Sequence, residues 1–300
     1  MPAQRQPSGE DGGSKLAPGL HLVATPIGNV GDLAPRALAA LRDADLVVCE
    51  DTRVTGKLLR LSDAMRPLVA YHDHNAARVR PQILARLRAG ASVALVSDAG
   101  TPLVSDPGYK LVREAIAQGT EVLALPGPSA ALAALTVSGL PSDRFLVAGF
   151  LPAKAGARRQ AIAELGAVPA TLILFEAARR VPQSLAELAA ALGPREAALA
   201  RELTNKFAEV RRGSLAELAA YYAAAGAPRG EVVLVIGPPA EHREVALDDV
   251  DAALQEALAC MSPAAAAASV AAATGLGRRE VYRRALALKD AVPGKKVDRR

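Results

Sequence analysis

Val93-Ala-Leu-Val-Ser-Asp-Ala-Gly-Thr-Pro102 is an apolar run that passes directly into a turn-rich loop. Four successive apolar residues bounded by turn signals predict a short buried strand. A helical pattern then runs from Tyr109 to Gln118 and ends at Gly119, a typical residue after a helix C-terminus. This stretch predicts the strand–loop–helix unit from which parallel α/β sheets are built.

The same unit recurs around it. Further strands are predicted at Leu22–Thr25 and Asp45–Cys49 before it, and at Glu121–Leu125 after it. Asp32 is expected to cap the helix that follows the first strand, with Pro35 in its first turn. The strands lack alternating polar residues, which predicts a sheet covered on both faces.

Changes of pattern divide the chain into four parts. Residues 1–18 are rich in Pro, Gly and Ser and predict a disordered tail, and residues 19–143 form the first α/β domain. Residues 144–240 predict a second α/β domain, and residues 247–300 a helical, basic C-terminal domain of RNA-binding type. Predicted strands of the second domain are Thr171–Phe175, Ala197–Arg201 and Glu231–Ile236.

The composition is that of a globular protein of the cytoplasm. The chain is 51% hydrophobic and 22% charged, and its two cysteines, Cys49 and Cys260, form no disulfide or metal-binding motif. No apolar run reaches the roughly 18 residues that span a bilayer, and the N-terminus has no secretory signal pattern. Aromatic residues make up 3%, which argues against an aromatic base-stacking surface.

The net charge of +5 is concentrated at the C-terminus. Nine basic residues and three acids lie between Gly275 and Arg300. Such a segment suits a polyanion, because lysine and arginine neutralise phosphates and release counterions. A solvated terminus has the same composition, and charge alone leaves both interpretations open.

Four loops at predicted strand ends are the candidates for ligand binding: Thr25–Asn29, Glu50–Arg53, Ser97–Gly108 and Pro126–Ala130. Ligands of open parallel sheets bind beyond the carboxyl ends of the strands. The loops therefore predict a nucleotide-like ligand. The phosphate-binding GxxxxGK[ST], the dinucleotide-binding GxGxxG and the hydrolase GxSxG motifs are all absent from the sequence.

His72 and His74 are the residues most suggestive of a metal site in this sequence. No cysteine lies near them and no HExxH pattern includes them, so we expect them to form hydrogen bonds within a loop. No metal site is predicted.

Read together, these loops and later motifs resemble the tetrapyrrole methylase family of S-adenosylmethionine-dependent methyltransferases. The residues that carry the resemblance are Val23–Asn29, Glu50–Arg53, Tyr71–Asn75, Leu95–Pro102, Ser105–Gly108, Leu125–Ser129, Gly139–Phe145, Gly149–Lys154, Arg201–Lys206 and Gly230–Val233. The match extends from about Leu20 to about Leu288. The family's usual Thr-Lys-x-x-Glu is here Thr204-Asn-Lys-Phe-Ala-Glu209, which is slightly offset.

The resemblance implies two α/β domains with S-adenosyl-L-methionine in the cleft between them, and a homodimer. It is closest to members that methylate a cytidine ribose 2′-oxygen in the decoding region of 16S rRNA, so the implied partner is the 30S subunit. The residues implied to bind the cofactor are Pro26, Gly28, Asp98, Gly100, Thr101, Pro102, Pro126, Gly127, Ser129 and Ala130.

Methyl transfer to an alcohol needs in-line positioning and a base that accepts the hydroxyl proton. Glu50, Asp51 and Asp98 are the candidate catalytic acids, because they follow predicted strands at this edge. For each, a role in capping a helix or turn is the competing interpretation. Candidate RNA-binding residues are Arg53, Arg278, Arg279, Arg283 and Arg284.

Three other functions remain open. A porphyrin C-methyltransferase shares the family's fold, although it has no need of a basic helical extension. A non-catalytic RNA-binding factor in ribosome assembly is the alternative from another class. An NAD-dependent oxidoreductase is disfavoured because the glycine motif is missing.

Overall fold

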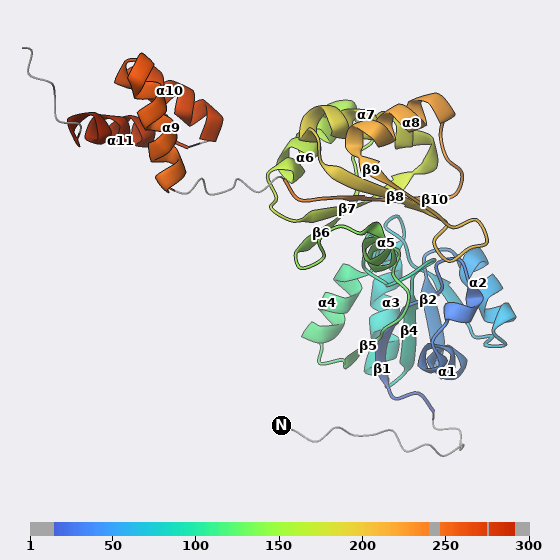
Figure 1. Cartoon of the computed structure of the whole chain (residues 1–300). Coiled ribbons are helices and arrows are strands. Elements are labelled where there is room, and N and C mark those ends of the chain that lie inside the picture. Colours follow the sequence, from blue (N-terminus) through green and yellow to red (C-terminus); the bar gives the residue numbers. More distant parts are fainter. Residues whose placement is uncertain (1–14, 240–246, 275, 292–300) are drawn as a thin grey trace, which may run out of the picture. The chain divides into compact units, whose positions relative to one another are not determined.

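A computed structural model of the chain describes residues 15–239, 247–274 and 276–291. The chain forms two compact units, one ending at Pro239 and the other beginning at residue 240 (Figure 1). Most of the predicted N-terminal tail, residues 1–14, lies outside the described residues. In the described part no helix is both long and apolar enough to cross a membrane.

The first sheet has the strand order β3-β2-β4-β1-β5, and every pairing is parallel, as predicted. Its strands are β1 (Gly19–Val23), β2 (Leu46–Cys49), β3 (Leu68–Ala70), β4 (Ser92–Val96) and β5 (Val122–Leu125). Strand β1 starts three residues earlier than the sequence predicts. Its polar residue His21 is buried, and the ring Nε2 atom hydrogen-bonds the Ala17 carbonyl oxygen at 2.8 Å.

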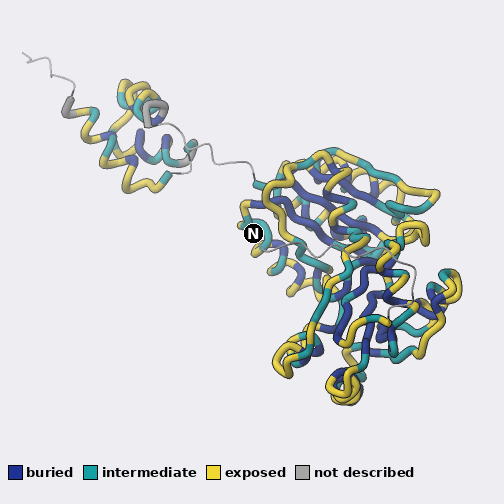
Figure 2. The backbone as a smooth tube through the Cα atoms, turned by 90° about the horizontal axis from the view of Figure 1, so that it is seen from below, coloured by how far each residue is buried: buried dark blue, intermediate teal, exposed yellow. Residues whose placement is uncertain are grey.

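Both faces of this sheet are covered by helices. Alternate β2 residues divide between them: Val47 and Cys49 belong to the core beneath α1 and α2, and Leu46 and Val48 to the core beneath α3 and α4. The helices are α1 (Pro35–Asp43), α2 (Thr52–Leu61), α3 (Ala76–Arg88) and α4 (Tyr109–Ala117). Figure 2 shows buried backbone at the centre of this lobe. The central strands β1, β2 and β4 are buried, as their composition predicts, whereas the edge strands β3 and β5 are only partly buried.

The predicted cap at Asp32 is wrong. Asn29 accepts a hydrogen bond from the Gly31 N–H (3.0 Å) and starts a short 3₁₀ helix, η1 (Val30–Asp32). Asp32 is therefore the last residue of that turn, and Ala34 precedes α1 without a side-chain cap. Pro35 is the first residue of α1, as predicted.

The second sheet has the order β6-β7-β10-β8-β9. Only β6 and β7 pair in parallel; the other three pairings are antiparallel. Its strands are β6 (Phe145–Phe150), β7 (Thr171–Ala177), β8 (Glu196–Arg201), β9 (Glu209–Ser214) and β10 (Glu231–Ile236). One face packs against α6 (Ala155–Gly166), α7 (Val181–Leu192) and α8 (Leu215–Ala225), and η2 (Ala178–Arg180) leads into α7.

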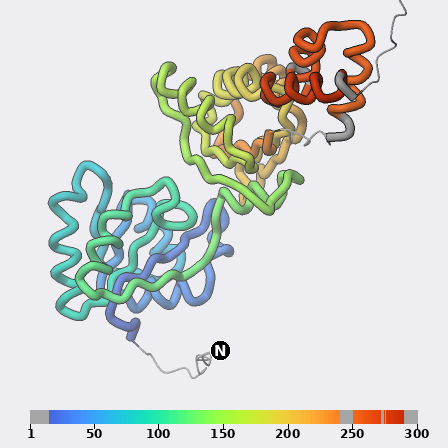
Figure 3. The backbone as a smooth tube through the Cα atoms, turned by 90° about the vertical axis from the view of Figure 1, so that its left-hand side faces the viewer, coloured from blue at the N-terminus to red at the C-terminus, as the bar shows by residue number. Residues whose placement is uncertain are grey.

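The other face packs against α5 (Ala130–Ser138), which follows the last strand of the first sheet. Ala131, Ala134 and Leu135 are buried in the same core cluster as Ile173 and Val235 of the second sheet. In Figure 1 this helix lies between the two sheets, and Figure 3 shows the sheets with their helices as two lobes. One segment thus joins both lobes.

The C-terminal unit is a small three-helix domain. It comprises α9 (Leu247–Cys260), α10 (Pro263–Thr274) and α11 (Arg278–Ala291), packed around Val250, Leu254 and Val281. The predicted helical character is confirmed. The end of the basic segment, residues 292–300, lies outside the described residues.

Candidate active site

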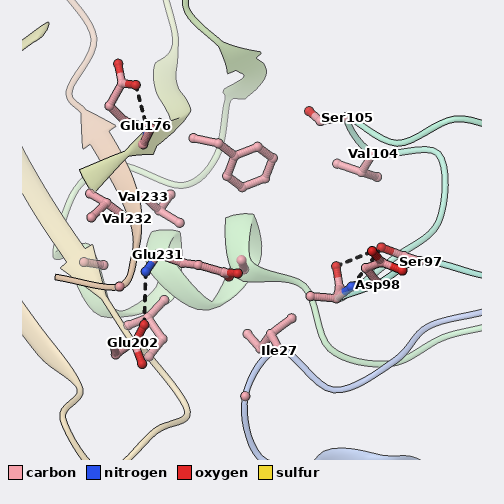
Figure 4. A pocket seen from close by; sticks show the side chains of 18 of the residues that line it. Ile27, Ser97, Asp98, Val104, Ser105, Glu176, Glu202, Glu231, Val232 and Val233 are labelled. Atoms are coloured by element: carbon pink, nitrogen blue, oxygen red, sulfur yellow. Dashed lines mark hydrogen bonds between the residues drawn. The ribbon is translucent and has the colours of Figure 1, made fainter. Parts of the chain in front are cut away.

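A cavity of about 530 Å³ lies where the two sheets of the larger unit face each other. The first lobe contributes the loops that follow β1 and β4, and the second contributes β7, β8, β10 and their adjoining loops. In Figure 4, Asp98 and Ser97 lie across the cavity from Glu202 and Glu231. The lining residues are Pro26, Ile27, Gly28, Ser97, Asp98, Ala99, Val104, Ser105, Asp106, Ala130, Phe150, Phe175, Glu176, Ala177, Ala200, Glu202, Leu203, Asn205, Gly230, Glu231, Val232 and Val233.

Carboxylates line both sides of this cavity. Burial raises the pKa values of Asp98 and Asp106. A hydrogen bond from the Asp51 N–H to Asp98, and one from the Ser97 hydroxyl to Asp106, partly oppose this rise. On the opposite side, burial followed by the charge of Glu202 raises the pKa of Glu231. The cavity therefore has a strongly negative potential when its acids are ionised.

Much of the remaining lining is apolar. Val232 and Val233 of β10 are buried beside the cavity, and the rings of Phe150 and Phe175 have centroids 5.6 Å apart. Glu176 is a further acid of the lining and is buried. It accepts hydrogen bonds from the Ser184 hydroxyl (2.5 Å) and the Ala177 N–H (2.8 Å), so its charge is compensated within the protein.

At Gly28 the loop after β1 lies against the β8–β9 loop of the second lobe. Its φ is +146°, and a Cβ atom there would lie 2.5 Å from Asn205 Oδ1 and 2.8 Å from Thr204 Oγ1. Only glycine fits this backbone and this distance. The β8–β9 loop thus contacts the loop after β1.

A second glycine shapes the opposite wall. Gly230 has φ +86°, and a Cβ atom there would lie 2.0 Å from Glu202 Oε1. That same oxygen accepts a hydrogen bond from the Glu231 N–H at 3.0 Å, while Glu202 itself has φ +51°. The glycine allows the Glu202 side chain to lie against the start of β10.

Of the residues expected to bind the cofactor, Pro26, Gly28, Asp98 and Ala130 line the cavity. Others shape its loops. The Thr25 and Gly100 backbones exchange hydrogen bonds of 3.0 and 3.1 Å, and the Thr101 hydroxyl donates to the Pro128 carbonyl at 3.1 Å.

The rest of that set lies in the same loops without lining the cavity. Ser129 caps α5 by accepting a hydrogen bond from the Leu132 N–H at 3.4 Å. A Cβ atom on Gly127 would lie 3.0 Å from the Ala24 Cβ, so that loop passes close to the end of β1. Pro102 and Pro126 are not among the lining residues.

Of the three candidate catalytic acids, only Asp98 lines the cavity. Asp51 caps α2 by accepting a hydrogen bond from the Arg53 N–H (2.8 Å), and the Arg53 guanidinium lowers its pKa to about 2. Glu50 does not line the cavity and is largely exposed to solvent. Its pKa is raised, first by the partial desolvation of its carboxyl group and then by the charges of Asp98 and Asp106. The Asp51 N–H donates to Asp98 Oδ1 at 3.1 Å, so Asp51 and Asp98 are directly linked.

The candidate RNA-binding residues lie on different elements. The side chain of Arg53 is 89% exposed and pairs with Asp51. On α11, Arg278, Arg279 and Arg283 are exposed, whereas Arg284 is half-buried and pairs with Asp251 of α9, with Nη2 3.0 Å from Oδ2. Arg284 thus links two helices of the domain.

The second lobe supplies residues that sequence reasoning did not select: Phe150, Phe175, Glu202, Asn205 and Glu231. The motifs Arg201–Lys206 and Gly230–Val233 were visible in the sequence. Their opposition to Asp98 depends on docking of the two sheets, and no local pattern encodes that.

The histidine segment forms local contacts. The His72 N–H donates to Asn75 Oδ1 at 2.9 Å, and the Asn75 side chain donates to the Ala70 carbonyl at 2.9 Å. Across residues 15–239, 247–274 and 276–291, no group of three or more His, Cys, Asp or Glu side chains is arranged to hold a metal ion.

Two family models match the chain. Residues 19–219 match Tetrapyrrole (Corrin/Porphyrin) Methylases, and residues 244–289 match the RsmI C-terminal HTH domain. Ribosomal RNA small subunit methyltransferase I of Mesorhizobium japonicum is 54% identical over 276 residues, covering 92% of this chain and 94% of the relative. The protein of that name from Erythrobacter litoralis is 53% identical, with 91% and 96% covered.

Solved structures share the fold of the larger unit. Uroporphyrin-III-C-methyltransferase from Thermus thermophilus superposes with a TM-score of 0.53 at 24% identity, covering 73% of this chain and 93% of that one. Diphthine synthase gives 0.58 at 19% identity, covering 73% and 89%. The extent of the family match and the identity to the curated relatives decide the assignment: the chain belongs to the tetrapyrrole methylase family and, within it, to the ribosomal RNA small subunit methyltransferase I family.

Proposed function

We propose that the protein transfers a methyl group from S-adenosylmethionine to the ribose 2′-oxygen of a cytidine in the decoding region of 16S rRNA. The coarser statement, methylation of ribosomal RNA, is supported by relatives of that name that match over nine-tenths of the chain. The observation that carries the proposal is the acid-lined cavity between the sheets, together with the loops that the family resemblance assigned to the cofactor.

The residues of the cavity fit this cofactor. S-adenosylmethionine supplies a methyl group on a positively charged sulfonium and carries an ammonium group and ribose hydroxyls. The carboxylates of Asp98, Glu202 and Glu231 are suited to these groups, because cations and hydroxyl donors relieve their mutual repulsion. Pro26, Gly28 and Ala130 offer backbone and small side chains for close approach, and Val232 and Val233 offer apolar surface for a base.

The other loop residues would act through the shape of the cavity. We assign Gly100, Thr101, Pro102, Pro126, Gly127 and Ser129 to this supporting role. Thr101 joins the loop after β4 to the loop after β5 by its bond to the Pro128 carbonyl, and Ser129 fixes the start of α5. A cofactor held between these loops would keep one orientation, which in-line transfer requires.

Asp98 is the proposed proton acceptor. A ribose hydroxyl is a weak nucleophile until its proton is removed, and a carboxylate of raised pKa is the stronger base. The Asp51 N–H holds one Asp98 oxygen and leaves the other for the substrate. Glu50 would contribute negative charge beside Asp98, and Asp51 would position Asp98 while capping α2.

The helical domain is the proposed RNA-anchoring part. Exposed Arg278, Arg279 and Arg283 would contact phosphates, and Arg284 would hold the helices together through Asp251. Arg53, exposed and near the candidate acids, would contact a phosphate of the bound strand.

A homodimer in the cytoplasm is part of this proposal. On α4, Tyr109 and Ile116 are 65% and 60% exposed, which suits burial against a second copy. The unpaired cysteines Cys49 and Cys260 suit a reducing compartment, where ribosomes also mature.

The test is transfer of a labelled methyl group to unmodified 30S subunits, with free 16S rRNA and a porphyrinogen alongside. We expect label on a cytidine ribose of the subunit. Asp98→Asn should lower kcat by at least tenfold, a larger factor than its effect on cofactor affinity, while Glu50→Gln serves as the nearby carboxylate control with a smaller effect on kcat. Label only on the porphyrinogen, or full activity of Asp98→Asn, would contradict the proposal.

A further inference from the structure

The four phenylalanines of this chain are its most unusual surface feature. There is no tryptophan, and no phenylalanine is buried: Phe145, Phe150 and Phe207 are 41%, 58% and 68% exposed, and Phe175 is half-buried. Large aromatic side chains normally contribute to cores or interfaces. Two of them, Phe150 and Phe175, line the cavity. Phe207, the most exposed, has no such explanation.

Phe207 belongs to the β8–β9 loop, other residues of which line the cavity. The β8–β9 loop, residues 202–208, contributes Glu202, Leu203 and Asn205 to the lining. Hydrogen bonds from the Asn205 N–H to the Glu202 carbonyl (2.8 Å) and from the Ala208 N–H to the Asn205 carbonyl (3.1 Å) define its turns. Figure 1 shows this loop reaching towards the first sheet, where Gly28 meets it.

Two cations are sequence neighbours of residues that line the cavity. Lys206 precedes Phe207, and Arg229 precedes Gly230, whose backbone lies against Glu202. Both cations are exposed, and neither forms an ion pair with any residue in the described part of the chain. We call Lys206, Phe207 and Arg229 the aromatic rim.

The neighbouring acids do not neutralise this rim. Glu209 is engaged by Arg201 at 2.8 Å and by Arg211 at 3.2 Å. Glu202 is held by the Glu231 N–H and by the Asn205 amide. The exposed rim thus combines an aromatic face with unpaired positive charge beside an acidic cavity.

We propose that the aromatic rim binds the single-stranded RNA next to the nucleotide that enters the cavity. Phe207 stacks on a neighbouring base, and Lys206 and Arg229 contact the flanking phosphates. The inference rests on the proposed function and deepens it, because it assigns recognition of the substrate strand to the α/β unit as well as to the helical domain. A second copy of the chain is the less favourable occupant, since two-fold packing about this rim would bring like charges together.

The test compares Phe207→Leu, Phe207→Tyr and Phe145→Leu in the full-length protein. Phe145→Leu is the matched control, because it removes an exposed phenylalanine of the same lobe that does not line the cavity. We measure binding of 30S subunits, KM and kcat on them, cofactor affinity by calorimetry, and oligomeric state by sedimentation.

Phe207→Leu should weaken 30S binding and raise KM by about tenfold, because the variant removes one stacking contact between the protein and a base. Phe207→Tyr keeps an aromatic ring and should leave 30S affinity and KM near their wild-type values. In both variants cofactor affinity and sedimentation should stay at wild-type values. The double variant Lys206→Gln/Arg229→Gln should reduce the slope of log affinity against log salt by about 0.7 for each phosphate that the protein no longer neutralises.

The outcomes separate the two proposals. Wild-type protein that binds 30S subunits without methylating them contradicts the proposed reaction, and the rim variants still report on binding. Equal 30S affinity for Phe207→Leu and wild type overturns the proposed RNA-binding role of the aromatic rim. Loss of the dimer in Phe207→Leu also overturns it, because that result assigns Phe207 to the contact between two copies of the chain. Absence of 30S binding by the wild type overturns both.

Discussion

Asp98, Asp106 and Glu231 meet in one cavity, and burial raises the pKa of each. A raised pKa means that the folded protein holds these protons more tightly than the unfolded chain does. These carboxyls therefore favour the folded state more as the pH falls through their raised pKa values, and less as it rises. A cationic ligand has the opposite preference, because it favours the ionised acids.

Cofactor binding should therefore release protons. We expect the affinity for S-adenosylmethionine to rise with pH through the raised pKa values and to level off above them. Calorimetry in two buffers of different ionisation enthalpy measures the proton release, and Asp98→Asn should diminish it. An affinity that does not change across this pH range would show that the acids do not face the cation.

Glycine at position 230 has a steric role that a matched control can isolate. Gly230 and Gly226 have φ values of +86° and +80°, but a Cβ atom meets Glu202 at the first and nothing within 4 Å at the second. Each change to alanine should cost about 1–3 kcal/mol of folding free energy from backbone strain. Gly230→Ala should in addition displace Glu202 and weaken cofactor binding by at least tenfold.

Thermal unfolding and cofactor calorimetry of Gly230→Ala and Gly226→Ala provide the comparison. Equal losses of cofactor affinity in both variants would mean that backbone strain, and not the Glu202 contact, governs the cavity wall.

At the scale of elements, α5 belongs by sequence position to the first lobe and by packing to the second. Its small residues allow close approach to the second sheet, where Ala134 is fully buried. Its N-terminal residue Ala130 lines the cavity. The helix therefore couples the position of the loop before it, which we propose contacts the cofactor, to the core of the other lobe.

Enlarging that contact should disturb both stability and the site. Ala134→Leu forces three extra carbon atoms into a filled core and should destabilise the protein by about 1–3 kcal/mol, with a loss of cofactor affinity. Ala163→Leu on the exposed side of α6 is the control and should change neither by more than about 0.5 kcal/mol. Denaturant unfolding and cofactor titration measure both effects, and a neutral Ala134→Leu would refute tight packing of α5.

Elements with a strong local signal were predicted well. The buried run Val93–Val96 falls within β4, and the predicted helix 109–118 is α4 to within one residue. The β3 strand has three residues, too few for a hydrophobic pattern to be recognised in the sequence. The β9 strand is an edge strand with the mostly polar sequence Glu-Val-Arg-Arg-Gly-Ser. Both depend on pairing with a neighbour that lies elsewhere in the sequence.

For the whole molecule, the division into two compact units predicts separable functions. Removing residues 248–300 should weaken 30S binding, most strongly at low salt, and leave cofactor affinity nearly intact. The triple variant Arg278→Gln/Arg279→Gln/Arg283→Gln keeps the helical core and the Arg284–Asp251 pair, so it tests the charges without removing the domain. Filter binding across a salt series measures both.

Equal 30S affinity of the truncated and full-length proteins at every salt concentration would remove the domain from RNA binding. A defect in the truncated protein without one in the triple variant would assign the domain a role other than phosphate contact.

The candidate site was half visible in the sequence. Strand-end loops identified Pro26, Gly28, Asp98 and Ala130, because chain reversals and strand ends have local signals. The sequence placed Glu50, Asp51 and Asp98 at one sheet edge and did not distinguish among them as candidate catalytic acids. The structure gives them different surroundings. The cap on α2 and the salt bridge to Arg53 engage Asp51, whereas Asp98 lines the cavity.

Local pattern by itself determined the parallel α/β character of the first lobe, the helical C-terminal unit and the loops that carry one wall of the cavity. It did so because hydrophobic period, turn residues and strand ends are properties of neighbouring residues. Only the tertiary structure decided the antiparallel pairings of the second sheet, the docking of α5 and the opposition of Glu202 and Glu231 to Asp98. Those features depend on packing between segments far apart in the chain, where shape and burial select the partner.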